Sequence, residues 1–147
     1  MKIILIRHGM TEGNLKRRYI GTTDEDLINT DCLKGDYPKC ERVVASPLKR
    51  CIQTAEYIYP NVDIEICDKL KECDFGDFEN KSYEDLKDNP DYQKWIDSNG
   101  ELPFPNGETH EDFKNRCKDG FFESLTERDT AFVIHGGSIM AIMQKLF

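Results

Sequence analysis

The chain has 147 residues and a formal net charge of −8, which argues against nucleic acid or an anionic membrane as its partner, because both bind basic surfaces. Hydrophobic residues make up 38% and charged residues 33%, as in a globular protein of one domain. The first apolar run, Ile3 to Ile6, is too short for a signal peptide or a membrane span, which need roughly 7–15 and about 20 residues. We therefore expect a cytoplasmic protein whose six cysteines are reduced thiols.

Four apolar runs along the chain predict β-strands. The first, second and fourth show little alternation of polar and apolar residues, which is typical of strands buried on both faces of a parallel sheet. The four predicted strands are residues 2–7, 42–46, 62–67 and 131–135.

Helical patterns lie between and after these strands. Ser46 is the expected N-cap of the first helix, with Pro47 in its first turn. A second pattern should be interrupted near Asn89 and Pro90, because proline disfavours a helical residue before it. The predicted helices are residues 48–59, 82–97 (as one or two helices), 108–125 and 138–147.

Strands that alternate with helices imply right-handed crossovers. The sequence shows no repeat, low-complexity segment or linker that would divide it. We therefore predict an α/β fold with three α/β/α layers and a mainly parallel sheet, as a single domain over residues 1–147.

Residues whose side chains can bind or react with a substrate follow the carboxyl ends of the predicted strands. His8 and His135 follow the first and last strands, and Arg50 follows the second near the start of a helix. The segment after the third strand supplies Glu72 and, two residues later, Asp74. Because parallel strands end at one edge of the sheet, we expect these side chains to meet there.

This set of residues suits phosphoryl transfer. The guanidinium groups of Arg7 and Arg50 match phosphate oxygens, and the turns after His8 and before Leu48 can aim backbone N–H groups at an anion. A neutral imidazole can attack phosphorus and carry the phosphate, while a carboxylic acid such as Glu72 protonates the leaving alkoxide. Asp74 is the carboxylate most easily confused with Glu72.

Five motifs in order resemble those of the histidine phosphatase superfamily, also called the phosphoglycerate mutase-like family. They are RHGMTEGN, SPLKRCIQTA, LKECDFGDFEN, PNGETHEDFKNR and VIHGG. Together they span nearly the whole chain. The runs RYIGTTDE and DFGDFEN, followed by a PNGE loop, are most similar to bacterial phosphatases of the alpha-ribazole phosphatase type.

The resemblance implies a role for each matching residue. His8 would be the phosphohistidine nucleophile and Glu72 the general acid and base, with Arg7, Arg50 and His135 forming the phosphate pocket. It implies no metal and no cofactor. Four further residues would contact the substrate: Asn14, Gly21, Thr22 and Gly136.

The expected activity is that of a metal-independent phosphomonoesterase acting on a small phosphorylated metabolite, with alpha-ribazole 5′-phosphate of cobalamin biosynthesis as a candidate. Its only expected partner is that small molecule, and the chain should be a monomer or a weak homodimer. Two alternatives remain open: a phosphotransferase of the phosphoglycerate mutase type, which would need a bisphosphate primer, and a catalytically inactive phosphate-binding module.

Two departures from the family pattern stand beside the resemblance. The acid motif ends in Glu79-Asn80 where the family usually has Glu-Gly, which puts the following turn in question. The chain stops at Phe147, before family members usually end, so the domain is expected to be truncated, with C-terminal strands absent and residues 2–6 at a sheet edge. The predicted strand order is third, second, fourth, first.

The segment from Ser82 to Gly107 is a predicted lid over the pocket. It has six carboxylates against two lysines, a net charge of −4, and it carries four aromatic residues. Such a lid would repel a second phosphate and favour a monophosphate with a neutral or aromatic body.

Overall fold

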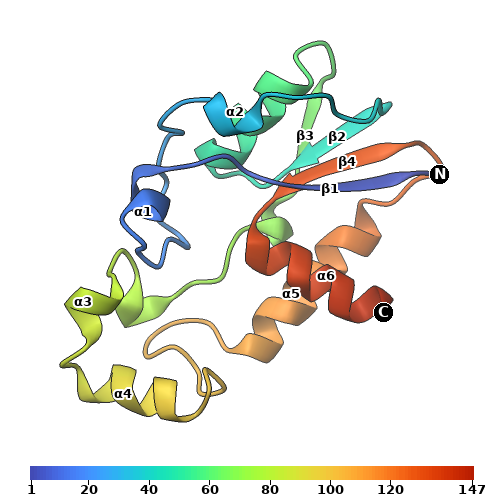
Figure 1. Ribbon diagram of the computed structural model, residues 1–147. Helices are drawn as coiled ribbons and strands as arrows, with labels where there is room; N and C mark the ends of the chain where they lie inside the picture. Colours follow the sequence, from blue (N-terminus) through green and yellow to red (C-terminus); the bar gives the residue numbers. More distant parts are fainter.

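Four parallel strands form the centre of the computed structural model, which describes residues 1–147 (Figure 1). They are β1 (Ile3–Arg7), β2 (Arg42–Ala45), β3 (Ile64–Ile66) and β4 (Thr130–Ile134). Their order in the sheet is β1-β4-β2-β3, and every pairing is parallel. Both the α/β fold and the predicted strand order are confirmed.

Helices cover both faces of this sheet. α2 (Lys49–Ile58) lies on one face, while α5 (His110–Glu123) and α6 (Gly136–Leu146) lie on the other (Figure 1). Each face of the sheet has its own hydrophobic core. Neighbouring residues of β2 pack into different cores, with Val43 on the α2 side and Val44 on the α5 side. Both faces of the strand therefore need apolar residues, which explains the missing alternation.

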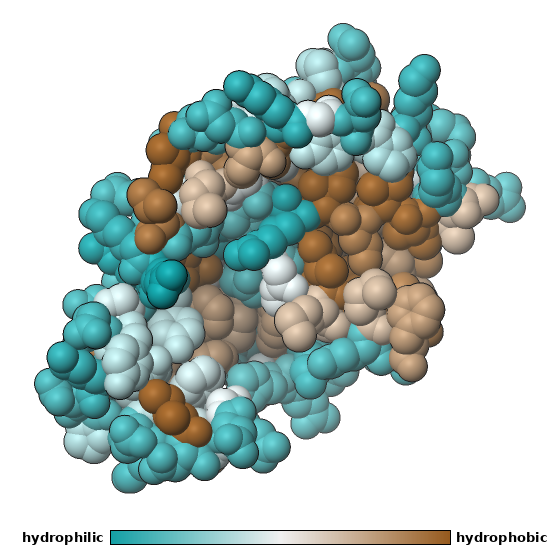
Figure 2. Space-filling view, viewed as in Figure 1, coloured by the Kyte–Doolittle hydropathy of each residue, from teal (hydrophilic) through white to brown (hydrophobic).

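The two outer strands differ from the central pair in exposure. β3 has only three residues, and Ile66 is 49% exposed. β1 pairs with β4 alone, so its other edge has no strand beside it. Between β1 and α6, Figure 2 shows an apolar region. On α6, the side chains of Met140 and Met143 are exposed.

The start of α2 corrects one prediction. Leu48 is the N-cap, Ser46 lies two residues earlier, and Pro47 is not in the helix. The side chain of Asp24 caps the helix from a distant part of the chain, because its Oδ1 accepts the Lys49 N–H at 2.7 Å. Ser46 instead turns its hydroxyl toward His135.

The region between β3 and α5 carries a core of its own. As expected, residues 82–97 form two helices, α3 (Tyr83–Leu86) and α4 (Pro90–Asp97), with Asn89 as the cap between them. The side chains of Phe78, Tyr92 and Phe104 are almost fully buried here, and those of Tyr19, Phe75 and Trp95 pack against them. We call these six residues the aromatic cluster.

Short elements complete the chain. α1 (Glu12–Leu15) begins with a capping box in which Thr11 and Asn14 exchange hydrogen bonds. Asn80 adopts φ +59°, a left-handed conformation that glycine favours and asparagine tolerates, which accounts for the Glu-Asn pair. All six cysteines are free, and no helix combines the length and the apolar character needed to cross a bilayer.

Candidate active site

The nucleophile predicted at His8 sits in a turn fixed by two hydrogen bonds. The His8 N–H donates to the carbonyl of Ile134 at 3.0 Å, which extends the pairing of β1 with β4 by one residue. The Gly9 N–H donates to Thr54 Oγ1 at 2.9 Å. His8 Nδ1 lies 2.6 Å from the Gly9 carbonyl oxygen, which can only accept, so Nδ1 carries the hydrogen. The lone pair of His8 Nε2 is therefore free to act as a nucleophile.

The protonation state of His8 also suits this role. Its pKa is lowered from 6.5 to about 4, mainly by burial and further by the charges of Arg50 and Arg7. The imidazole is therefore neutral at neutral pH. His8 lines a pocket, so the free nitrogen is accessible.

His135 lies directly behind His8, at the N-cap of α6. The two rings are edge to face, with centroids 5.2 Å apart. His135 is completely buried, and its Nε2 is 2.8 Å from Ser46 Oγ and 3.4 Å from Cys51 Sγ. Its pKa is lowered to about 2, chiefly by burial and then by the positive charge of Arg50, so this ring is neutral as well.

Arg50 is buried beneath the pocket and joins it to the loop Ile20–Thr23, which we call the 20–23 loop. Its terminal nitrogens donate to the carbonyls of Thr23 at 2.7 Å and Gly21 at 2.9 Å. Its Nε has no hydrogen-bond partner and is buried. A buried N–H without an acceptor is rare, and here it leaves one donor for an anion.

Glu79 holds the same loop from the other side, a role that the sequence did not reveal. Its carboxylate accepts hydrogen bonds from the N–H groups of Gly21, Thr22 and Thr23 and from the Thr23 hydroxyl, at 2.6 to 3.3 Å. Gly21 is required because a Cβ there would lie 2.0 Å from the Cys73 carbonyl oxygen.

Glu72 lines the pocket. Its Oε1 accepts the Cys73 N–H at 2.9 Å. It also rests against the first turn of α6, since a Cβ on Gly137 would lie 2.5 Å from this oxygen. Burial raises the pKa of Glu72, which favours the protonated form that a general acid requires. Asp74 instead accepts the Gly76 N–H at 2.9 Å and stabilises a turn.

A pocket of about 460 Å³ brings most of the predicted residues together. Arg7, His8, Asn14, Glu72 and Gly136 all line it. Arg50 and His135 lie buried outside this lining, close enough for the charge of Arg50 to lower the pKa of His8. The remaining lining residues, which the sequence did not single out as site residues, are Arg18, Tyr19, Ile20, Phe75, Gly137, Ile139 and Met140.

Two predicted substrate contacts lie elsewhere. Gly21 and Thr22 do not line this pocket, and both of their N–H groups donate to Glu79. The structure gives them a part in holding the 20–23 loop. Their contact with a substrate stays a prediction.

The lid prediction is wrong for this pocket. No residue of 82–107 lines it, and three of the four aromatic side chains of that segment, those of Tyr92, Trp95 and Phe104, pack into the aromatic cluster. The aromatic wall comes instead from Tyr19 and Phe75. Composition alone could not tell an aromatic residue that lines the pocket from one that packs in the core, because the difference is burial.

The sequence predicts backbone donors in the turns after His8 and before Leu48, but the structure offers them at α6. In the turn after His8, the Gly9 N–H already donates to Thr54 Oγ1 at 2.9 Å. α6 begins at Gly136 without a side-chain cap, so the positive end of the helix dipole faces the pocket beside Arg7. At α2 the expectation is wrong, because Ser46 Oγ accepts the Leu48 N–H and Asp24 accepts the Lys49 N–H. These amides are already satisfied.

Comparison with known proteins supports the family resemblance seen in the sequence motifs. The family model described as Histidine phosphatase superfamily (branch 1) matches residues 3–147. The Uncharacterized phosphatase PhoE of Bacillus subtilis is 32% identical, over 98% of this chain and 76% of that protein. The Broad-specificity phosphatase YOR283W of Saccharomyces cerevisiae is 30% identical, over 99% of this chain and 70% of that protein.

A solved structure with a similar fold is the alpha-ribazole phosphatase of Shigella flexneri. It superposes with a TM-score of 0.83 at 26% identity, over 99% of this chain and 79% of that one. The α/β fold with its mainly parallel sheet agrees with this structural match. The chain belongs to the histidine phosphatase superfamily.

Proposed function

We propose that this protein hydrolyses a small phosphate monoester through a phosphohistidine at His8. The observation that carries the proposal is the neutral imidazole with Nε2 free in a pocket that also contains Arg7, Asn14 and Glu72. Phosphate would be held by Arg7, by the positive end of the α6 dipole and by the Asn14 amide. Asn14 Oδ1 already accepts the Thr11 N–H, which leaves its NH₂ group as a donor.

The reaction takes two displacements. In the first, His8 Nε2 attacks phosphorus, the P–O bond to the alcohol breaks, and the Glu72 carboxyl gives its proton to the leaving oxygen. In the second, the Glu72 carboxylate takes a proton from water, the water oxygen bonds to phosphorus, and the P–N bond breaks. Arg50 and His135 stabilise the phosphoryl group from beneath.

Hydrolysis is favoured over transfer to a second substrate because the pocket is open to water. Met140, at its wall, is 64% exposed. A phosphotransferase must keep water from the phosphohistidine. Turnover should accordingly need no bisphosphate primer, and a requirement for one would favour the mutase alternative.

The substrate class follows from the walls of the pocket. Tyr19 and Phe75 supply an aromatic surface, and Arg18 adds a cationic group. An aromatic or sugar-like body can pack on these rings while the phosphate meets Arg7. This supports a nucleoside-like monophosphate, and alpha-ribazole 5′-phosphate is one example, in keeping with the similarity to the alpha-ribazole phosphatase of Shigella flexneri.

The test is a phosphate trap with a His8→Ala control. Brief exposure to labelled substrate followed by denaturation should leave a label that is stable to base and labile to acid. His8→Ala should carry no label and should lose all but a trace of activity. Substantial activity in His8→Ala would exclude the covalent route, and complete inactivity of the wild type on aryl and alkyl phosphates would favour the inactive binding module.

A further inference from the structure

The segment that carries Glu72 has no regular secondary structure. Lys71 to Phe75 lies between two short 3₁₀ turns and pairs with no strand, so its backbone groups must find partners elsewhere. A general acid on such a segment could move relative to His8 by more than a productive geometry allows. We call residues 71–75 the acid segment.

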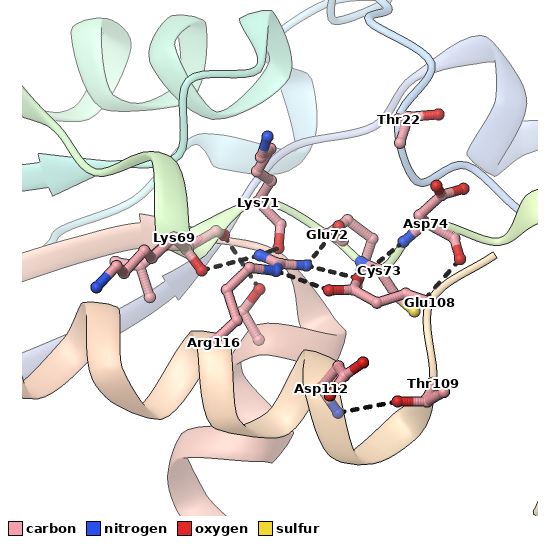
Figure 3. Close-up of polar contacts among 12 residues, drawn as sticks. Thr22, Lys69, Lys71, Glu72, Cys73, Asp74, Glu108, Thr109, Asp112 and Arg116 are labelled. Carbon is pink, nitrogen blue, oxygen red and sulfur yellow. Dashed lines mark hydrogen bonds and ion pairs between the residues drawn. The ribbon is translucent and has the colours of Figure 1, made fainter. Parts of the chain in front are cut away.

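Arg116 of α5 supplies those partners. Its NH1 donates to the carbonyls of Lys69 and Lys71, both at 2.9 Å, and its NH2 donates to the carbonyl of Glu72 at 3.3 Å (Figure 3). Three carbonyls from residues 69–72 are therefore fixed by one planar guanidinium. The Leu70 carbonyl, which lies among them, accepts from Ser138 Oγ at 3.2 Å.

Glu108 completes the arrangement from the other side. Its carboxylate accepts both Arg116 Nε and Arg116 NH2 at 2.8 Å, a bidentate ion pair in which the side chains are only 22% (Arg116) and 18% (Glu108) exposed. Glu108 Oε1 also accepts the Asp74 N–H at 3.2 Å, and the Glu108 N–H donates to the Asp74 carbonyl at 3.0 Å. The ring of Phe113 lies against Arg116, with 5.2 Å between the ring centroid and Cζ.

We propose that Glu108 and Arg116 are positioning residues that hold Glu72 at its working distance from His8. The inference rests on the proposed function, because it gives Glu72 the role of acid and base. Neither residue lines the 460 Å³ pocket, so both act through the backbone on either side of Glu72. Arginine is needed for this task, because lysine cannot reach three carbonyls and a carboxylate with one planar group.

The decisive experiment compares two leaving groups. Arg116→Met should lower kcat/KM for a simple alkyl phosphate by roughly 10- to 100-fold, since a displacement of about 1 Å can cost that much. The loss for 4-nitrophenyl phosphate should stay below about threefold, because nitrophenolate leaves with little help from an acid. Inhibition by inorganic phosphate should be unchanged. Arg116→Lys should recover part of the loss on the alkyl ester.

A double variant separates positioning from general stability. If Arg116 acts through Glu72, then Arg116→Met should have almost no further effect on alkyl ester hydrolysis in a Glu72→Gln background. Arg116→Met losses that are equal on both esters, or that multiply with Glu72→Gln, would overturn the inference. Should Arg116→Met fail to fold, Glu108→Gln is the second variant, with a smaller loss of the same pattern expected.

Arg42→Met is the matched control. Arg42 forms the same kind of fork with Glu65, at 2.9 and 3.0 Å, and donates to the Ser124 carbonyl, but it lies at the opposite end of the sheet. The Arg42→Met variant should leave the ratio of the two kcat/KM values unchanged, and a shifted ratio would overturn the inference.

A separate outcome concerns the proposed function. If Glu72→Gln itself shows no dependence on the leaving group, the acid role of Glu72 fails, and the positioning role of Arg116 and Glu108 fails with it.

Discussion

Replacing Glu79 with alanine would remove the carboxylate that holds the 20–23 loop. Four donors lose their acceptor: the N–H groups of Gly21, Thr22 and Thr23, and the Thr23 hydroxyl. A hydrogen bond to a charged group contributes about 1.5–3 kcal/mol when it is buried. Because part of this loop is exposed and freed donors can bind water, we take about 0.5–1 kcal/mol for each donor.

The four bonds then sum to about 2–4 kcal/mol of unfolding free energy, which for a chain of this size lowers the Tm by roughly 5–12 °C. Phosphate affinity should fall as well, because Arg50 donates to carbonyls of the same loop and would lose its orientation. Thermal unfolding by circular dichroism and inhibition by inorganic phosphate measure the two effects.

Two further variants give reference points for the loss of unfolding free energy in Glu79→Ala. Glu79→Gln keeps one oxygen acceptor and should lose about half as much free energy as Glu79→Ala. Glu123→Ala removes a carboxylate with a single exposed partner, Lys69, and should change the free energy of unfolding by less than about 0.5 kcal/mol. If Glu79→Ala is as mild as Glu123→Ala, water satisfies the loop and the reasoning is wrong.

Three more results are expected. Glu72→Gln should slow hydrolysis of alkyl phosphates by roughly 10²–10⁴-fold while phosphate still binds, and the deficit should shrink for nitrophenyl esters; equal losses on both would assign Glu72 to structure. An NMR titration should give the His8 ring a pKa near 4, and a midpoint near 6.5 would contradict the neutral, buried nucleophile. A chelator should not inhibit, since Arg7 and Arg50 supply the positive charge; inhibition that magnesium reverses would change the mechanism.

Periodicity and strand ends were sufficient to predict the sheet and the position of its histidines. The runs around Val44 and Phe132 are apolar because both sheet faces are covered, and this pattern is local in the sequence. His8 and His135 follow directly, since each is the first residue beyond its strand. The order of the strands came from the family resemblance rather than from periodicity.

What the sequence could not give depends on contacts between distant residues. Asp24 caps α2 in place of Ser46, Glu79 binds amides 56 to 58 positions away, and Arg116 reaches the Glu72 carbonyl 44 positions away. None of these pairs has a spacing that local pattern can detect. The sequence predicts a lid from the aromatic residues of 82–107 for the same reason, because the burial of Tyr92, Trp95 and Phe104 depends on distant partners such as Phe78 and Phe113.

The aromatic cluster has a consequence for how the protein opens. It forms a hydrophobic core separate from the two cores that flank the sheet, and α3 and α4 project away from the sheet in Figure 1. Native proteins open in cooperative units, and a unit with its own small core can exchange its amide hydrogens without global unfolding. Opening of this unit would release the acid segment while β1 and β4 keep His8 in place. On heating, the protein would then lose turnover before it loses its sheet.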